Sequence, residues 1–165
     1  MWGFRVILER IPPDKYVKLD QSKNPFDRIH NCQILQYSRI DPKTGETTQV
    51  DFPADAGIGK LEQINIDSLG INVIFVSARN VDLDGKNGID WNDPTQIIIL
   101  SPDGKQKKQL TDDKFFARTW AVNKLTGTIV ITGHYDTNNN GKYDKTDKNE
   151  IHIFDLKTFK AVNII

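Results

Sequence analysis

The sequence has few of the features that mark a disulfide-bonded, membrane-spanning or nucleic-acid-binding protein. Its only cysteine, Cys32, excludes an internal disulfide. Acidic and basic residues balance at 22 each, so the net charge of zero gives no electrostatic case for nucleic acid. No apolar run approaches the roughly 20 residues of a membrane-spanning helix, and Met1–Val6 shows no signal-peptide pattern. We therefore expect no nucleic-acid partner and no membrane insertion.

Helix-forming residues are also scarce. Only 4 of the 22 acidic residues are glutamate, whereas 18 are aspartate, and there are 13 asparagines. Short Asp and Asn side chains bond to the nearby backbone, which favours turns and metal-binding loops. Isoleucine and valine number 29, against 16 alanines and leucines, and branched side chains pack well on a pleated surface. The composition predicts an all-β fold in a single repeat domain, residues 1–165.

The second half of the chain contains two similar units. Each has an apolar run that ends at an aspartate, then a loop rich in Asp, Asn and Gly, then a second run, a turn and a third run. The two loops, Asp82–Asp93 and Asp136–Asp147, are offset by 54 residues. A further strand-like segment precedes each unit, at Leu61–Asp67 and Arg118–Asn123. Each unit therefore predicts four antiparallel strands in about 50 residues.

A weaker copy of this unit opens the chain. Its apolar runs are Arg5–Leu8, Gln33–Tyr37 and Thr47–Val50, and it lacks the strand that precedes the other two units. The approximate repeats are residues 1–55, 56–111 and 112–165. They predict eleven strands in all.

Four-stranded units of this length stack as the blades of β-propellers. In the second unit Ile99–Gly104 leads to Leu110 and Thr111, and in the third unit Trp120–Asn123 leads to Gly127 and Ile129. These motifs resemble the TolB-like, WD40-like propeller repeat of bacteria. The resemblance implies four-stranded antiparallel blades and a location in the periplasm or on the cell surface. We expect Phe115, Phe116 and Trp120 to pack in the core between blades rather than to form a ligand platform.

Three blades do not close a ring, because propellers usually have about four to eight. The uncovered sheet edges of an incomplete ring would promote aggregation. Three possibilities remain open. The chain is either a fragment of a longer protein or an open stack of sheets, or it is one half of a homodimer in which two copies form a six-bladed ring.

The loop Asp136–Asp147 fits the twelve-position calcium loop at every ligand position. Side-chain oxygens fall at positions 1, 3, 5, 9 and 12, position 6 is a glycine and position 7 offers a backbone carbonyl. An aspartate at position 12 resembles dockerin loops, and the placement between strands resembles the integrin propeller. The predicted Ca²⁺ ligands are Asp136, Asn138, Asn140, the Lys142 carbonyl, Asp144 and Asp147.

The loop Asp82–Asp93 is a less complete copy. Position 5 is Lys86, which cannot ligate, and position 6 is Asn87, which adopts a left-handed turn less readily than glycine. Asn87 could itself ligate if the loop bulged by one residue. The predicted ligands are Asp82, Asp84, Asn87, Asp90 and Asp93. The alternative for both loops is a set of turns without metal, whose carboxylates bond only to backbone N–H groups.

The sequence contains no recognisable catalytic motif, neither an H-E-x-x-H pair nor a nucleophile motif around Cys32. We therefore expect a non-catalytic, calcium-stabilised binding or scaffold module with a protein or glycan ligand. Extracytoplasmic calcium would keep such loops filled. The alternatives are the propeller portion of a peptidase or glycan-active hydrolase, and an assembly subunit that dimerises into a ring. The exposed or packed role of Trp91 stays open, and His152 is expected to face solvent or a neighbouring strand.

Overall fold

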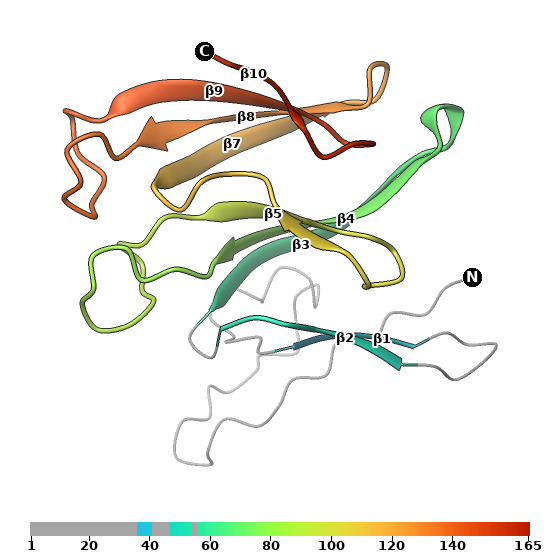
Figure 1. Cartoon of the computed structure of the whole chain (residues 1–165), viewed down its shortest axis with the longest axis horizontal. Coiled ribbons are helices and arrows are strands. Elements are labelled where there is room, and N and C mark those ends of the chain that lie inside the picture. Colours follow the sequence, from blue (N-terminus) through green and yellow to red (C-terminus); the bar gives the residue numbers. More distant parts are fainter. Residues whose placement is uncertain (1–35, 41–46, 54–55) are drawn as a thin grey trace, which may run out of the picture.

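The computed structural model describes residues 36–40, 47–53 and 56–165, which form ten strands and one short 3-10 helix (Figure 1). The helix η3 (Asp67–Leu69) joins the third and fourth strands. The strands are β1 (Gln36–Ile40), β2 (Thr47–Asp51), β3 (Gly57–Ile66), β4 (Ile71–Arg79), β5 (Gln96–Leu100), β6 (Lys107–Gln109), β7 (Phe115–Asn123), β8 (Thr128–Tyr135), β9 (Lys148–Asp155) and β10 (Ala161–Ile164).

The strands form two four-stranded sheets and one two-stranded sheet. β3, β4, β5 and β6 are neighbours in that order, as are β7, β8, β9 and β10, and β1 pairs with β2. Every pair is antiparallel. The all-β class and the four strands of each later unit are therefore confirmed. The sheets do not close into a ring within the described part of the chain.

Two boundaries differ from the sequence expectation. β3 begins at Gly57 and β7 at Phe115, several residues before the predicted starts at Leu61 and Arg118. In the first unit, Thr47–Val50 lies within β2, and the end of Gln33–Tyr37 overlaps the start of β1. The predicted strand at Arg5–Leu8 and the residue Cys32 lie outside the described residues.

The three sheets lie as successive layers, with the β3–β6 sheet in the middle (Figure 1). All five residues of β5 are buried, because this sheet is covered on both faces. Successive side chains of a strand point to opposite faces. Accordingly, Ile97 and Ile99 join the core shared with the β7–β10 sheet, whereas Ile98 and Leu100 join the core shared with β2 and the residues that follow it.

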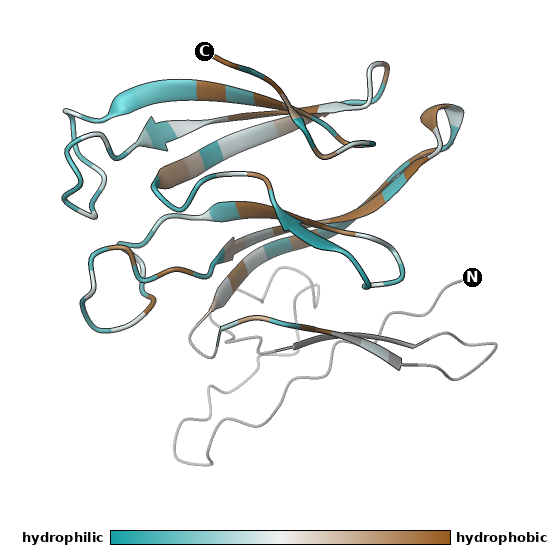
Figure 2. Ribbon diagram, in the orientation of Figure 1, coloured by the Kyte–Doolittle hydropathy of each residue, from teal (hydrophilic) through white to brown (hydrophobic). Residues whose placement is uncertain are grey.

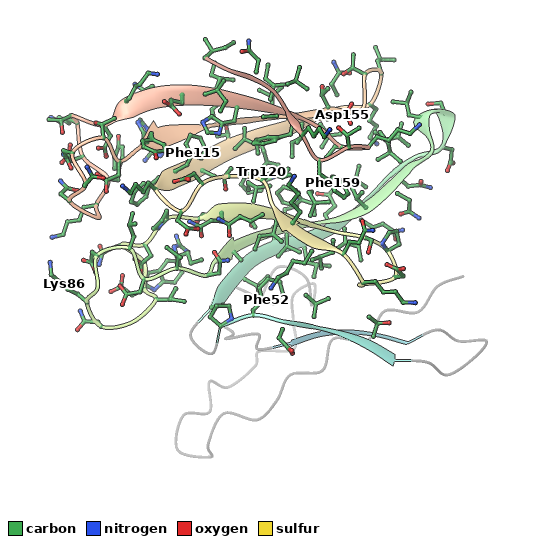
Figure 3. All side chains as sticks on the ribbon, viewed as in Figure 1. Phe52, Lys86, Phe115, Trp120, Asp155 and Phe159 are labelled. Atoms are coloured by element: carbon green, nitrogen blue, oxygen red, sulfur yellow. The ribbon has the colours of Figure 1, made fainter. Side chains whose placement is uncertain are left out.

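Aromatic side chains fill the layer between the two four-stranded sheets. Phe115 is fully buried, and the ring of Trp120 packs against Phe75 of the facing sheet with centroids 5.0 Å apart (Figure 3). The predicted core positions Phe115 and Trp120 are thus confirmed, whereas Phe116, though buried, belongs to neither core cluster. On the other face of the β3–β6 sheet, Phe52 packs in the second core. Figure 2 shows the apolar residues on the strands and the hydrophilic residues concentrated in the loops.

His152 is buried in the same layer, 4% exposed, rather than facing solvent. Its ring stacks on Phe115 at 4.1 Å, and its Nε2 lies 2.8 Å from Glu150 Oε2. Gly133 makes this stack possible, because a Cβ on it would lie 2.7 Å from Phe115 Cζ. Among the described residues, no helix is long and apolar enough to cross a membrane.

The layered packing predicts a large penalty for emptying its centre. Phe75→Ala should lower the free energy of unfolding by about 3–5 kcal/mol, because Phe75 is 1% exposed and packs against the opposite sheet. Leu125→Ala is the control, since Leu125 is 90% exposed and should change stability by less than about 0.5 kcal/mol. Urea denaturation measures both, and equal losses would contradict the stacked arrangement.

Candidate metal centre

The two Asp-rich loops occupy equivalent places in the two four-stranded sheets. One joins β4 to β5 and the other joins β8 to β9, and both lie at the same end of the stack, on the left of Figure 1. Each therefore joins the second strand of its sheet to the third. The stacking of the sheets brings the loops side by side.

Three carboxylates of the first loop meet. One oxygen each of Asp82, Asp84 and Asp93 lies within 4.8 Å of the others, and no other group of three His, Cys, Asp or Glu residues in the described ranges meets as closely. Asp93 is 3% exposed, Asp84 is half-buried and Asp82 is exposed. Like charges at this separation repel each other, so the cluster is a place where a cation would lower the energy.

Backbone N–H groups hold these carboxylates in place. Asp93 Oδ1 accepts a hydrogen bond of 2.8 Å from the Leu83 N–H, and Asp93 Oδ2 accepts one of 2.7 Å from the Asp90 N–H. Asp82 Oδ1 and Asp84 Oδ1 both accept from the Lys86 N–H. The Asp90 carboxylate lies outside the trio and accepts from the Asn92 N–H at 2.7 Å. The second oxygens of Asp82 and Asp84 accept no backbone N–H.

The second loop repeats this pattern. Asp136 Oδ1 and Asn138 Oδ1 both accept from the Asn140 N–H, as Asp82 and Asp84 do from Lys86. Asp147 Oδ2 accepts from the Asp144 N–H at 2.9 Å, as Asp93 does from Asp90. The equivalence therefore covers positions 1, 3, 9 and 12 of the predicted calcium loops.

The backbones match at two left-handed positions and differ at position 7, where Gly88 has φ of 73° and Lys142 has no positive φ. Asn87 and Gly141 share the left-handed turn at position 6, with φ of 65° and 70°. Gly85 and Asn139 share a second left-handed position, with φ of 66° and 57°. The loops therefore align without an inserted residue, and the exposed Asn87 holds the turn. Ligation by Asn87 and by the Lys142 carbonyl stays a prediction.

One ligand position of the second loop has an unused oxygen. Asp147 is 7% exposed, and its buried Oδ1 accepts no hydrogen bond from any residue that the structure describes. A buried carboxylate oxygen without a partner is costly. It lies at position 12 of the predicted calcium loop, where a cation would satisfy it.

Asp144 is the most strongly hydrogen-bonded carboxylate of this loop. The Thr146 hydroxyl, the Thr146 N–H and the side-chain amides of Asn138 and Asn140 all donate to it. These bonds, that of the Thr146 hydroxyl above all, hold the pKa of Asp144 well below its usual range. Asp144 is therefore ionised at any pH at which the protein would meet a metal.

Arg79 belongs to the site although no motif in the sequence points to it. It ends β4, and its Nε donates to the Asp93 carbonyl at 3.2 Å. Burial lowers the pKa of Arg79 from its ordinary value, while Asp93 and Asp90 oppose that shift. Its cationic side chain ties the end of the first loop to the sheet.

The two loops touch at Gly141. A Cβ on Gly141 would lie 2.7 Å from Asp84 Cα and 2.8 Å from Asp84 Cβ. Because Gly141 also has φ of +70°, both its conformation and its contact require glycine. The sequence explains Gly141 by the turn alone. In the structure this glycine also sets how closely the two loops approach each other.

Comparison with known proteins gives this chain no family. No known protein-family model matches it, and none of the curated proteins matches it. The geometry of its two loops carries the functional inference.

Gly141→Ala should destabilise the protein by more than the roughly 1–2 kcal/mol of a left-handed alanine, because the methyl group would also displace Asp84. Gly70→Ala is the matched control, since Gly70 is also left-handed, with φ of +63°, and a Cβ there meets no described atom within 4 Å. Urea denaturation in EDTA measures both variants without metal. Equal stability of the two variants would show that the loops do not touch.

Proposed function

We propose that this protein is a non-catalytic binding or scaffold module whose two Asp-rich loops are stabilised by Ca²⁺. One observation carries the proposal: the carboxylates of Asp82, Asp84 and Asp93 converge to within 4.8 Å, in a loop whose hydrogen bonds recur in Asp136–Asp147. The recurrence makes a chance cluster of surface acids a poor explanation, because two separate sequences adopt the same arrangement.

The donor chemistry favours Ca²⁺ among the common ions. The predicted ligands are carboxylate, amide and backbone oxygens, and no cysteine or histidine belongs to the Asp82, Asp84 and Asp93 cluster. Zn²⁺ prefers nitrogen and sulfur ligands. Mg²⁺ requires a near-octahedral set and keeps its water, whereas Ca²⁺ accepts six to eight oxygens from a flexible loop.

The role of the ion would be structural. Half or more of the residues of each loop are exposed, and neither loop contributes a residue to the two apolar core clusters of the described chain, so apolar packing contributes little to their order (Figure 2). A cation would neutralise the converging carboxylates and link the two ends of each loop, since its ligands come from the first and last positions. A loop ordered in this way presents its side chains as a fixed binding surface.

The cellular setting follows from the same chemistry. Loops of this kind fill at micromolar to millimolar calcium, which extracytoplasmic spaces supply. This supports a bacterial periplasmic or surface protein, as the resemblance to TolB-like propellers implies. The face-to-face stacking of four-stranded antiparallel sheets supports propeller-type blades in an open stack.

A homodimer is the second candidate arrangement. The outer side of the β7–β10 sheet and its end leave Ile151, Val162, Ile164 and Ile165 between 39% and 63% exposed. A second copy stacked on this face would cover them as the β7–β10 sheet covers its neighbour. Sedimentation velocity tests this: a strict monomer at high concentration would exclude the dimer, and a stable dimer would support ring closure.

Calcium should raise the melting temperature. If the dissociation constant is about 10 µM, 1 mM CaCl₂ adds about 2.7 kcal/mol for each filled site. At about 2–4 °C per kcal/mol, one site raises the midpoint by roughly 5–11 °C over EDTA. Thermal unfolding followed by circular dichroism measures the shift, with 1 mM MgCl₂ as the control. No difference between CaCl₂ and EDTA would reduce both loops to metal-free turns.

Two nearly isosteric variants separate the loops. Asp93→Asn should remove calcium binding by the first loop and Asp147→Asn by the second. Isothermal titration should then count two ions in the natural protein, one in each variant and none in the double variant. Asp67→Asn, a change of the same kind outside both loops, should leave the count at two. A count that does not change in either variant would refute the assignment of the ligands.

A further inference from the structure

A cleft of about 590 Å³ opens between the two loops, beside the cluster of Asp82, Asp84 and Asp93, and its lining includes Asp84 and Asp93. Its walls come from both four-stranded sheets, because the β4–β5 loop lines one side and the β8–β9 loop the other. The lining includes Arg79, Lys86 and Trp91 from one sheet and Arg118, Lys142 and Tyr143 from the next. Figure 3 shows Lys86 at the outer tip of its loop.

Each sheet contributes one arginine stacked on an aromatic ring. The guanidinium carbon of Arg79 lies 4.8 Å from the ring centroid of Trp91, and that of Arg118 lies 4.7 Å from the ring centroid of Tyr143. Stacking uses only the flat face of a guanidinium group and leaves its N–H fork in the plane. Both forks are therefore held in place by rings of the cleft wall.

Arg118 is free to bind a ligand. Its side chain forms no hydrogen bond or ion pair within the described part of the chain. Its guanidinium group stacks on the ring of Tyr143. Arg118 is the extra residue of a β-bulge, since Ala117 pairs with Gly133 and Thr119 with Thr132. A bulge re-aims a side chain out of the regular alternation of a strand. The bulge therefore explains how a strand residue comes to line the cleft.

The cleft is complementary to an anion. Four cationic side chains line it, those of Arg79, Lys86, Arg118 and Lys142, against the carboxylates of Asp84 and Asp93. The two carboxylates already have other partners, because Asp93 accepts backbone N–H groups and Asp84 lies 4.0 Å from Lys86 Nζ. A cation on the Asp cluster would make the cleft still more positive.

The remaining lining residues suit a sugar. Trp91 is 69% exposed and presents an apolar ring at the wall, while Asn87, Asn92 and Thr95 offer amide and hydroxyl groups. Carboxylates bind to arginine forks in two-point contacts, sugar hydroxyls pair with amides, and the flat face of a sugar ring packs on an indole. We propose that this cleft binds an acidic oligosaccharide through the carboxylates of its uronic acid residues.

This inference rests on the proposed binding role but does not require the metal, because four cationic side chains line the cleft against two carboxylates even when the loops hold no ion. The probe is a hyaluronan tetrasaccharide, which carries two glucuronates, titrated into the full chain with CaCl₂ and again with EDTA. Chitotetraose, which has no carboxylate, is the matched neutral sugar. We expect the acidic sugar to bind, the neutral sugar not to bind, and CaCl₂ to tighten the affinity.

Arg118→Gln tests the site directly. Loss of a charge-assisted contact should weaken binding of the tetrasaccharide by about 10- to 100-fold. The thermal midpoint and the calcium titration should not change, because Arg118 forms no hydrogen bond or ion pair with a described loop residue. It contacts the β8–β9 loop only by stacking on the ring of Tyr143. Lys124→Gln removes the same charge from an exposed turn and is the matched control. Equal weakening by Lys124→Gln would show non-specific attraction and overturn the site.

Four other outcomes are equally decisive. Binding of chitotetraose as tight as that of the acidic sugar would refute carboxylate recognition. Tighter binding of a hexaglutamate peptide would make an acidic protein segment the ligand and overturn the sugar assignment. No binding of the tetrasaccharide with a normal calcium titration would refute this cleft while leaving the calcium proposal intact. Binding of the sugar without any binding of calcium would support the cleft and refute the calcium proposal.

Discussion

Burial of both faces of the β3–β6 sheet is the constraint on which the rest of the structure depends. β5 has no polar face to offer solvent, so the sheet must lie between two others. That requirement stacks the β7–β10 sheet directly on it and fixes Phe75, Phe115 and Trp120 between them. The loops at the end of the stack have no comparable apolar packing. Their placement beside each other follows from the sheets that carry them.

Hydrogen bonds then order the two loops, which apolar packing does not hold. In both loops, backbone N–H groups donate to side-chain oxygens of the predicted ligands, and these bonds recur at corresponding positions. Such bonds orient the charges but do not neutralise them, and the buried Asp147 Oδ1 accepts none. The repulsion between the neighbouring carboxylates is thus confined to the loops. A cation bound there can neutralise it without changing the sheets.

Local features of this protein could be predicted from its sequence, and long-range ones could not. The 54-residue offset predicted the strands of both later units, because apolar runs and turn residues act within a few positions. It also predicted matching loops. By contrast, no local pattern shows that Gly141 meets Asp84, that a bulge re-aims Arg118, or that the carboxylates meet most closely in the loop with the less complete motif. These depend on how one sheet lies on the next.

The contact between Gly141 and Asp84 restricts how this protein can vary during evolution. Surface loops usually tolerate insertions and deletions, because nothing outside the loop depends on their length. Here the tip of one loop rests on the start of its neighbour, so an added residue in either loop would push the two apart. Change of length in one repeat would require a compensating change in the next. Duplication of whole repeats preserves that contact, and piecemeal growth of single loops does not.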